Sequence, residues 1–260
     1  MVEKTLKQRL ADGQTVRVMA LGALASPKFI EIAALAADVH GIWIDQEHVA
    51  IPHPQLEVLL MACRSVGLDA FARVPPTDYC TIMRPMEAGA SGVMVAQINT
   101  LEQVEQIVRW AKYPPMGERG MFRSNYEAGY GTTDTAEHAG RANRDRWLVI
   151  QIETASALEC VEQIAAVEAV DCVFVGPGDL ALNLGVPGQV MHAKCVKALK
   201  RVSAAAAAAG KPWGNLCTSE EHAALCLSLG CRLISVVTDT QVLRLGFEAA
   251  KSKMANVFSA

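Results

Sequence analysis

LVIQIETASALECVEQIAAVEAVDCVFVGPGD, residues 148–179, contains one complete repeat of the predicted fold. An apolar run at 148–152 is followed by a helical pattern at 155–167 and a second apolar run at 172–175. Two strands joined by a crossover helix lie parallel in one sheet. Each run also ends in polar residues, with Glu153 after the first and Asp179 after the second. The segment therefore predicts a β/α unit with both carboxylates at one end of the sheet.

The same alternation of short β-branched runs and longer helical patterns covers the rest of the chain. The eight predicted strands are Val16–Ala20, Gly41–Asp45, Asp69–Arg73, Gly92–Ala96, Leu148–Ile152, Cys172–Val175, Pro212–Cys217 and Leu233–Val237. The predicted helices are Pro27–Ala37, Pro54–Val66, Thr77–Ala88, Leu101–Lys112, Ala155–Val167, Val190–Ala209 and Ser219–Leu229. Four of these helices are followed by glycines that turn the chain into the next strand, namely Gly67, Gly89, Gly210 and Gly230.

This pattern predicts the α/β class and a (β/α)8 TIM barrel in a single domain over residues 1–260. The alternative is a doubly wound open sheet. Eight strands and the lack of a GxGxxG motif after a strand favour the closed barrel. Residues 112–146 form one long excursion between elements, which we expect to be a rim or lid over the site because long loops in compact domains are usually functional.

The composition excludes several classes of function. The formal net charge is -3 and no run of like charge occurs, so neither a nucleic-acid nor a membrane partner is indicated. No apolar run approaches the roughly 20 residues of a membrane span, and the short apolar stretch at 18–25 fits a first strand better than a signal peptide. The eight cysteines are scattered singly, which predicts reduced core residues in a cytoplasmic protein. The expected partners are small molecules and further copies of this chain.

Polar residues stand at the ends of four predicted strands. In a barrel these ends meet at one mouth, where the reactive groups of such enzymes gather. The residues concerned are Asp45, Glu47 and His48 after the second strand, Arg73 at the end of the third, Gln151 and Glu153 at the fifth, and Asp179 after the sixth.

Glu153 and Asp179 follow neighbouring strands, so their carboxylates would repel unless a cation lay between them. Two hard oxygen ligands, with water or substrate in the remaining positions, suit Mg²⁺ or Mn²⁺, with Co²⁺ as a further candidate. The alternative is that each carboxylate caps the helix that follows it. We expect metal ligation, because capping does not explain the nearby Arg73 and His48.

Three further features of the mouth have a functional and an ordinary interpretation. Arg73 either stabilises an enolate oxygen or only pairs with a site carboxylate. His48 either moves a proton at neutral pH or is a hydrogen-bonded bystander. The turn Gly176–Asp179 either offers N–H groups to a substrate carboxylate or is simply a tight turn. The lysines fall outside the strand ends, which disfavours a Schiff-base mechanism and favours a metal.

Several stretches together resemble the HpcH/HpaI aldolase family of pyruvate-dependent class II aldolases, from about Val16 to beyond Val237. They are IDQEH (44–48), GLDAFARVP (67–75), MRPMEAGASGVMVAQI (83–98), PPMGERG (114–120), IQIET (150–154) and VDCVFVGPGDLALNLG (170–185). The lid sequence MFRSNYEAGYG matches the substrate-binding loop of the family less closely than its flanking motif does.

The resemblance implies a divalent metal held by Glu153 and Asp179, and Arg73 polarising a keto oxygen. It also implies that His48 is a base working with Glu87, where many members have aspartate. Gln151 and Gly178 are implied to contact substrate, although many members have alanine at the latter position. The assembly implied is a hexamer or trimer, often with C-terminal helices exchanged between subunits.

The expected function is that of a carbon–carbon lyase that makes or cleaves 4-hydroxy-2-oxo acids from pyruvate and an aldehyde through a metal-stabilised enolate. One alternative is an acyl-CoA carbon–carbon lyase of the same family, which would need a basic groove for the CoA phosphates. The other alternative is a barrel that binds a keto acid or metal without catalysis.

Overall fold

The computed structural model describes residues 2–258, and eight parallel strands in it close into a barrel in sequence order. The strands are β1 (Val16–Leu21), β2 (Gly41–Asp45), β3 (Asp69–Val74), β4 (Gly92–Val95), β5 (Trp147–Ile152), β6 (Cys172–Val175), β7 (Trp213–Leu216) and β8 (Leu233–Thr238). β1 pairs with both β2 and β8, which closes the ring. The predicted closed barrel is confirmed, and the open sheet is wrong.

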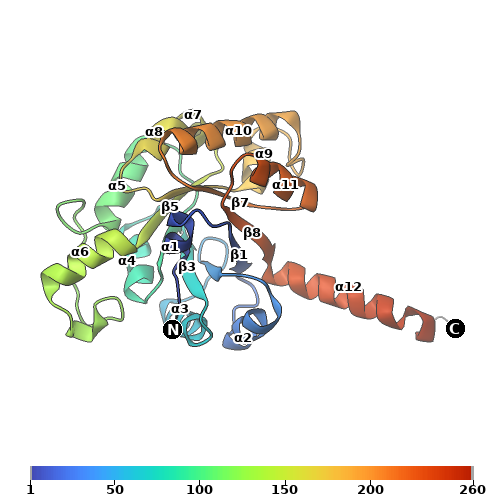
Figure 1. Cartoon of the computed structure of the whole chain (residues 1–260), viewed down its shortest axis with the longest axis horizontal. Helices are drawn as coiled ribbons and strands as arrows, with labels where there is room; N and C mark the ends of the chain where they lie inside the picture. Colours follow the sequence, from blue (N-terminus) through green and yellow to red (C-terminus); the bar gives the residue numbers. More distant parts are fainter. Residues whose placement is uncertain (1, 259–260) are drawn as a thin grey trace.

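Helices surround the barrel and cover one of its ends (Figure 1). They are α1 (Leu6–Ala11), α2 (Pro27–Ala36), α3 (His53–Ser65), α4 (Tyr79–Glu87), α5 (Leu101–Ala111), α6 (Thr135–Asp145), α7 (Ala155–Glu159), α8 (Val161–Ala166), α9 (Pro177–Asn183), α10 (Ala193–Ala208), α11 (Glu220–Ser228) and α12 (Asp239–Phe258), with a 3₁₀ turn at Gly129–Gly131. The helix predicted at 155–167 is divided at Cys160 into α7 and α8. α1 and α6 were not predicted.

The interior of the barrel is filled by large side chains from alternate strand positions. Trp43, Phe71, Trp147 and Phe174 lie in one buried cluster, with the rings of Phe71 and Trp147 edge to face at 5.0 Å between centroids. Leu6 of α1 joins this cluster, so α1 closes the amino-terminal end of the barrel, here called the floor. The carboxyl ends of the strands remain open at the opposite end, called the mouth.

The excursion at 112–146 connects α5 to β5, so it starts and ends at the floor, and it packs along the outside of the barrel. Its middle packs outside the barrel, where the N–H of Gly120 donates to the Tyr79 hydroxyl of α4 at 2.7 Å. Arg119 and Glu127 within it form a buried ion pair. Tyr79 is the first residue of α4, so Gly120 lies beside the mouth-side end of that helix. The role of this excursion as a rim or lid over the site stays a prediction.

α12 leaves the barrel as a long helix that projects beyond the rest of the molecule (Figure 1). Its first residue, Asp239, is buried and accepts hydrogen bonds from the N–H groups of Gly22 and Leu24, which anchors the helix to the loop after β1. Further along, Leu245 and Phe247 expose 52% and 67% of their surface. No helix within residues 2–258 is both long enough and apolar enough to cross a bilayer.

Candidate active site

Arg73 lies at the centre of the polar groups in the mouth. Arg73 of β3 is in register with Asp45 of β2. The two side chains form a bidentate ion pair, in which Nε of Arg73 lies 3.1 Å from Oδ1 of Asp45 and Nη2 lies 2.7 Å from Oδ2. Nη1 is 3.1 Å from Oε2 of Glu47, and the guanidinium carbon is 4.7 Å from the Trp43 ring centroid. The guanidinium is therefore fixed between two carboxylates and an aromatic face, with its remaining N–H groups available to a ligand.

His48 follows the same strand end but lies further out. Asp45 Oδ1 accepts hydrogen bonds from the backbone N–H groups of Glu47 and His48, which turns the chain after β2. The His48 side chain is 59% exposed, and its Nε2 is 3.7 Å from Oε2 of Glu47. Glu47 thus lies between the guanidinium of Arg73 and the imidazole of His48.

Glu153, at the end of β5, is fully buried, and both of its carboxylate oxygens accept hydrogen bonds. Oε1 accepts from the backbone N–H of Gln97 at 2.8 Å and from its side-chain amide at 3.1 Å, while Oε2 accepts from the amide of Gln151. Gln97 has a φ of 54°, a left-handed conformation uncommon for a residue with a side chain. This turn directs the N–H of Gln97 at the carboxylate of Glu153. Strained backbone conformations of this kind often occur at functional sites.

The electrostatic surroundings of Glu153 oppose its ionisation. Burial is the main cause that raises the pKa of Glu153 to about 7, and the negative charges of Glu47 and Asp179 raise it further. The Gln97 N–H and the Arg73 guanidinium act in the opposite direction but do not compensate. A cation between these carboxylates would remove the conflict, because it favours the ionised form of each.

Neither Glu153 nor Asp179 caps a helix through its side chain. α7 is capped by Thr154, whose hydroxyl accepts from the N–H of Ala157, and the cap of α9 is Gly176. Asp179 lies in the first turn of α9, and its carboxylate makes no hydrogen bond or ion pair to any residue within 2–258. The capping alternative therefore does not account for these two residues.

A cavity of about 220 Å³ opens beside these groups, with Arg73, Gln151, Glu153 and Asp179 in its wall. Gly176 borders it too, and a Cβ there would overlap Oε2 of Glu153 and Nε2 of Gln151, so a side chain at this position would displace both groups. The neighbouring Gly178 has open space where its Cβ would be. The cavity thus contains the metal and substrate residues predicted from strands three, five and six.

Glu87 does not join this group. It is the last residue of α4, and α4 runs from the mouth back to the floor, whereas His48 follows β2 at the mouth. Its Oε1 is buried, 3.9 Å from Nη2 of Arg119, and has no hydrogen-bond partner within residues 2–258. The expected pairing of His48 with Glu87 is therefore not made within one chain, and Glu47 is the acidic neighbour of His48.

Three residues of the site were missed from the sequence. Gln97 follows β4 as Glu153 follows β5, so its position after an apolar run was a signal. Trp43 stacks on Arg73 from within β2, and Thr218 lines the cavity after β7. Among residues 2–258 no cluster of three or more His, Cys, Asp or Glu side chains is arranged to hold a metal ion. A cation here would therefore have two carboxylate ligands from the chain.

The closed barrel with charged groups on its strand ends defines a TIM-barrel enzyme, and the comparisons identify which kind. The chain belongs to the HpcH/HpaI aldolase/citrate lyase family, whose model matches residues 17–245. It is therefore a carbon–carbon lyase of the aldolase type. This finding favours an enzyme over the non-catalytic alternative.

Named relatives extend over nearly the whole chain. A 5-keto-4-deoxy-D-glucarate aldolase of Shigella boydii serotype 18 is 32% identical over 97% of this chain and 95% of its own length. One of Klebsiella pneumoniae is 34% identical, covering 91% of this chain and 90% of its own.

Solved structures agree with the family assignment. An HpcH/HpaI aldolase of Desulfitobacterium hafniense has a TM-score of 0.89 at 27% identity, covering 96% of each chain. A family member from Burkholderia cenocepacia has a TM-score of 0.88 at 31% identity, covering 96% of this chain and 98% of its own.

The raised pKa of Glu153 predicts how pH acts on the stability of the metal-free protein. The unfolded carboxyl ionises near 4.5 and the folded one near 7. The stability that Glu153 contributes is thus fully present below pH 4.5 and is lost as the pH rises through 7. We expect Glu153→Gln, which cannot ionise, to gain stability relative to wild type by about 2 to 3 kcal/mol between pH 4.5 and pH 8. Chemical unfolding in EDTA at both pH values measures this, and an equal difference at the two would contradict it.

Proposed function

We propose that the protein is a divalent-cation-dependent aldolase that cleaves or forms a 4-hydroxy-2-oxo acid. Pyruvate is the 2-oxo acid that is released or consumed. The observation that carries this proposal is the buried Glu153 beside Asp179 and Arg73 in one cavity. The family assignment supports the making or breaking of a carbon–carbon bond. The three residues support a substrate that carries a keto group beside a carboxylate.

The donor set fits a hard divalent cation. The negative charge of Asp179 disfavours the ionisation of Glu153, and the carboxylate of Asp179 has no hydrogen-bond or ion-pair partner within the described chain. Two carboxylate ligands with open positions for water and substrate are typical of Mg²⁺ and Mn²⁺. When bound, the cation would supply a Lewis acid that polarises the keto group of the substrate.

Arg73 is arranged to stabilise a developing oxyanion. Three of its five N–H groups face Asp45 and Glu47, which leaves two to donate to the keto oxygen of a substrate in the cavity. The ion pairs fix the plane of the guanidinium before substrate arrives, so no reorganisation is needed as charge develops on that oxygen.

The substrate carboxylate would lie against the start of α9. Leu180 is the first residue of this helix whose N–H bonds back to a carbonyl, that of Gly176, so the N–H groups of Gly178 and Asp179 are available to an anion. Gly178 adds no side chain that would cover them, and the amide of Gln151 faces the same cavity. These contacts would orient the keto acid with its reactive carbons toward the opening.

His48 is the group proposed to move the proton. In cleavage it accepts the proton of the 4-hydroxyl, and the bond between carbons 3 and 4 then breaks. Carbon 4 becomes the aldehyde carbonyl, and the electron pair of the broken bond forms the enolate of pyruvate. A proton then adds to the enolate carbon to give the methyl group of pyruvate. Oε2 of Glu47 lies 3.7 Å from Nε2 of this imidazole and is its acidic neighbour. The exposed position of His48 allows it to exchange protons with solvent.

Two features disfavour other mechanisms. The wall of the cavity contains no lysine that could form an imine with the keto group. Its cationic lining consists of Arg73, which is already paired, so it offers no basic groove for the phosphates of an acyl-CoA. The relatives named as 5-keto-4-deoxy-D-glucarate aldolases make that sugar acid the first compound to assay.

Cation-dependent release of pyruvate tests the proposed function. We expect the purified protein to release pyruvate from 5-keto-4-deoxy-D-glucarate or another 4-hydroxy-2-oxo acid, measured by a coupled lactate dehydrogenase assay. Exhaustive EDTA treatment should abolish the release, and Mn²⁺ or Mg²⁺ should restore it. Full activity after chelation, or cleavage of acyl-CoA esters alone, would refute the proposal.

Substitution of Arg73 separates charge stabilisation from cation binding. Arg73→Ala should reduce kcat at least 100-fold, since the loss of one preorganised oxyanion donor typically has this effect. Arg73→Lys should recover only part of this, because it keeps the charge but not the fork. Mn²⁺ affinity, measured by calorimetry, should change less than tenfold. Arg201→Ala, which removes an exposed pair with Glu162, is the control. Unchanged turnover in Arg73→Ala would disprove its role.

We also propose that the chain assembles as a homo-oligomer through α12. An exposed helix with Leu245 and Phe247 on its surface indicates contact with another protein surface. The double variant Leu245→Glu with Phe247→Glu should reduce the mass measured by light scattering, whereas Lys253→Glu on the same exposed helix should not. A wild-type protein that is already monomeric would contradict this assembly.

A further inference from the structure

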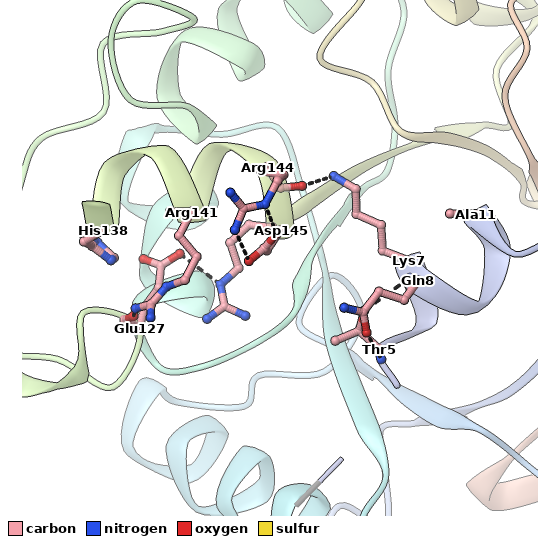
Figure 2. Close-up of a pocket in the computed structure, with 11 residues that line it drawn as sticks. Thr5, Lys7, Gln8, Ala11, Glu127, His138, Arg141, Arg144 and Asp145 are labelled. Carbon is pink, nitrogen blue, oxygen red and sulfur yellow. Dashed lines mark hydrogen bonds and ion pairs between the residues drawn. The ribbon is translucent and has the colours of Figure 1, made fainter. Parts of the chain in front are cut away.

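A second cavity, of about 460 Å³, lies at the floor of the barrel, on the side away from the mouth. In Figure 2, Lys7 and Gln8 of α1 line one side, and His138, Arg141 and Glu127 line the other. It has about twice the volume of the mouth cavity and shares no lining residue with it. The proposed aldolase chemistry makes no use of it.

The wall of this cavity is strongly basic. Lys7, Arg141, Arg144 and Arg146 line it together with only two carboxylates, those of Glu127 and Asp145. These side chains leave an excess of two positive charges, and Lys7 is itself paired with Asp171, outside the wall, at 2.9 Å. The positive charge available to a ligand is therefore that of the arginines. A concave surface with like charges on its wall attracts ions of the opposite sign.

The carboxylates in the wall are already paired. Glu127 is almost fully buried, and Arg119, which is not part of the wall, binds both of its oxygens. Its Oε1 accepts a further hydrogen bond from Nε of Arg146 at 3.1 Å. Asp145 is paired with Arg144 at 2.8 Å.

Arg141 has no anionic partner of its own. Its Nη2 donates to the backbone carbonyl of Glu127 at 3.1 Å, and no carboxylate of residues 2–258 lies within 4.0 Å of its guanidinium. Arg146 likewise uses only its Nε in a hydrogen bond within this range. Both guanidinium groups therefore have N–H donors left to bind an anion in a bidentate way.

His138 provides a separate indication of a polar ligand. Its ring is fully buried at the wall, with Nε2 3.3 Å from the Tyr113 hydroxyl, while Nδ1 has no hydrogen-bond partner within residues 2–258. Burial, and then the nearby arginines, lower the pKa of His138, so the ring is neutral at pH 7 and adds no charge. Buried polar atoms in folded proteins are normally satisfied, so the unpaired nitrogen points to a missing partner.

We propose that this floor cavity binds the phosphate group of a small molecule. A phosphate carries up to two negative charges at neutral pH, which matches the excess charge of the wall, and its oxygens suit the forks of Arg141 and Arg146. The volume exceeds that of a phosphate group, which leaves room for the organic part of a phosphate ester. The group that the cavity recognises is the phosphate, whether it is free or part of an ester.

Thermal unfolding and ³¹P NMR test this site with inorganic phosphate and with glycerol 3-phosphate at constant ionic strength. Both probes should raise the unfolding temperature above that in chloride, and their ³¹P lines should broaden on adding protein. A stronger effect of glycerol 3-phosphate would identify esters as the ligands, and an equal effect would identify phosphate itself. Arg141→Ala should weaken binding about tenfold or more, since a hydrogen bond to a charged group contributes about 1.5 to 3 kcal/mol.

Arg109→Ala is the matched control, because it removes an exposed arginine that does not line the cavity. Arg144→Ala provides a second test at an exposed position, should Arg141→Ala fail to fold. Pyruvate release should persist in all three variants, which keeps this test separate from that of the aldolase. Phosphate responses equal in wild type, Arg141→Ala and Arg144→Ala, or no response beyond that to chloride, would overturn the proposal.

Discussion

Four carboxylates, those of Asp45, Glu47, Glu153 and Asp179, share the mouth of the barrel with the guanidinium of Arg73. In a partly buried space such an excess of negative charge is unfavourable unless protons, hydrogen-bond donors or a cation compensate it. Arg73 neutralises the charge next to β2, and donors from Gln97 and Gln151 only partly compensate Glu153. The mouth is therefore built to receive positive charge, and the proposed chemistry follows from that imbalance.

The sequence allowed the barrel to be predicted because short, mostly apolar runs alternate with helical patterns, and all eight strands were placed to within one residue at either end. It also allowed Arg73, Glu153 and Asp179 to be grouped, since parallel strands bring their carboxyl ends together. Gln97 was missed because its role depends on a left-handed backbone turn that composition does not reveal. The pairing of Glu87 with His48, which the resemblance implies, is not made within the described chain, because Glu87 ends a helix that runs to the floor.

The two ends of the barrel carry opposite charge, and β5 connects them. Arg146, directly before this strand, lines the basic floor cavity, and Glu153, directly after it, lines the acidic mouth. A net charge of -3 conceals this separation, because it sums the two ends. The charged residues indicate the two sites only when each is assigned to one end of a strand. The closed hydrogen-bonded ring fixes those strand ends in space.

The absence of a side chain at Gly176 has a consequence for how this protein can diverge. Every amino-acid replacement at that codon introduces a carbon atom into the space of Glu153 and Gln151. A side chain at position 176 therefore requires the carboxylate of Glu153 and the amide of Gln151 to move together, so one substitution there would alter two neighbours at once, whereas position 178 faces open space.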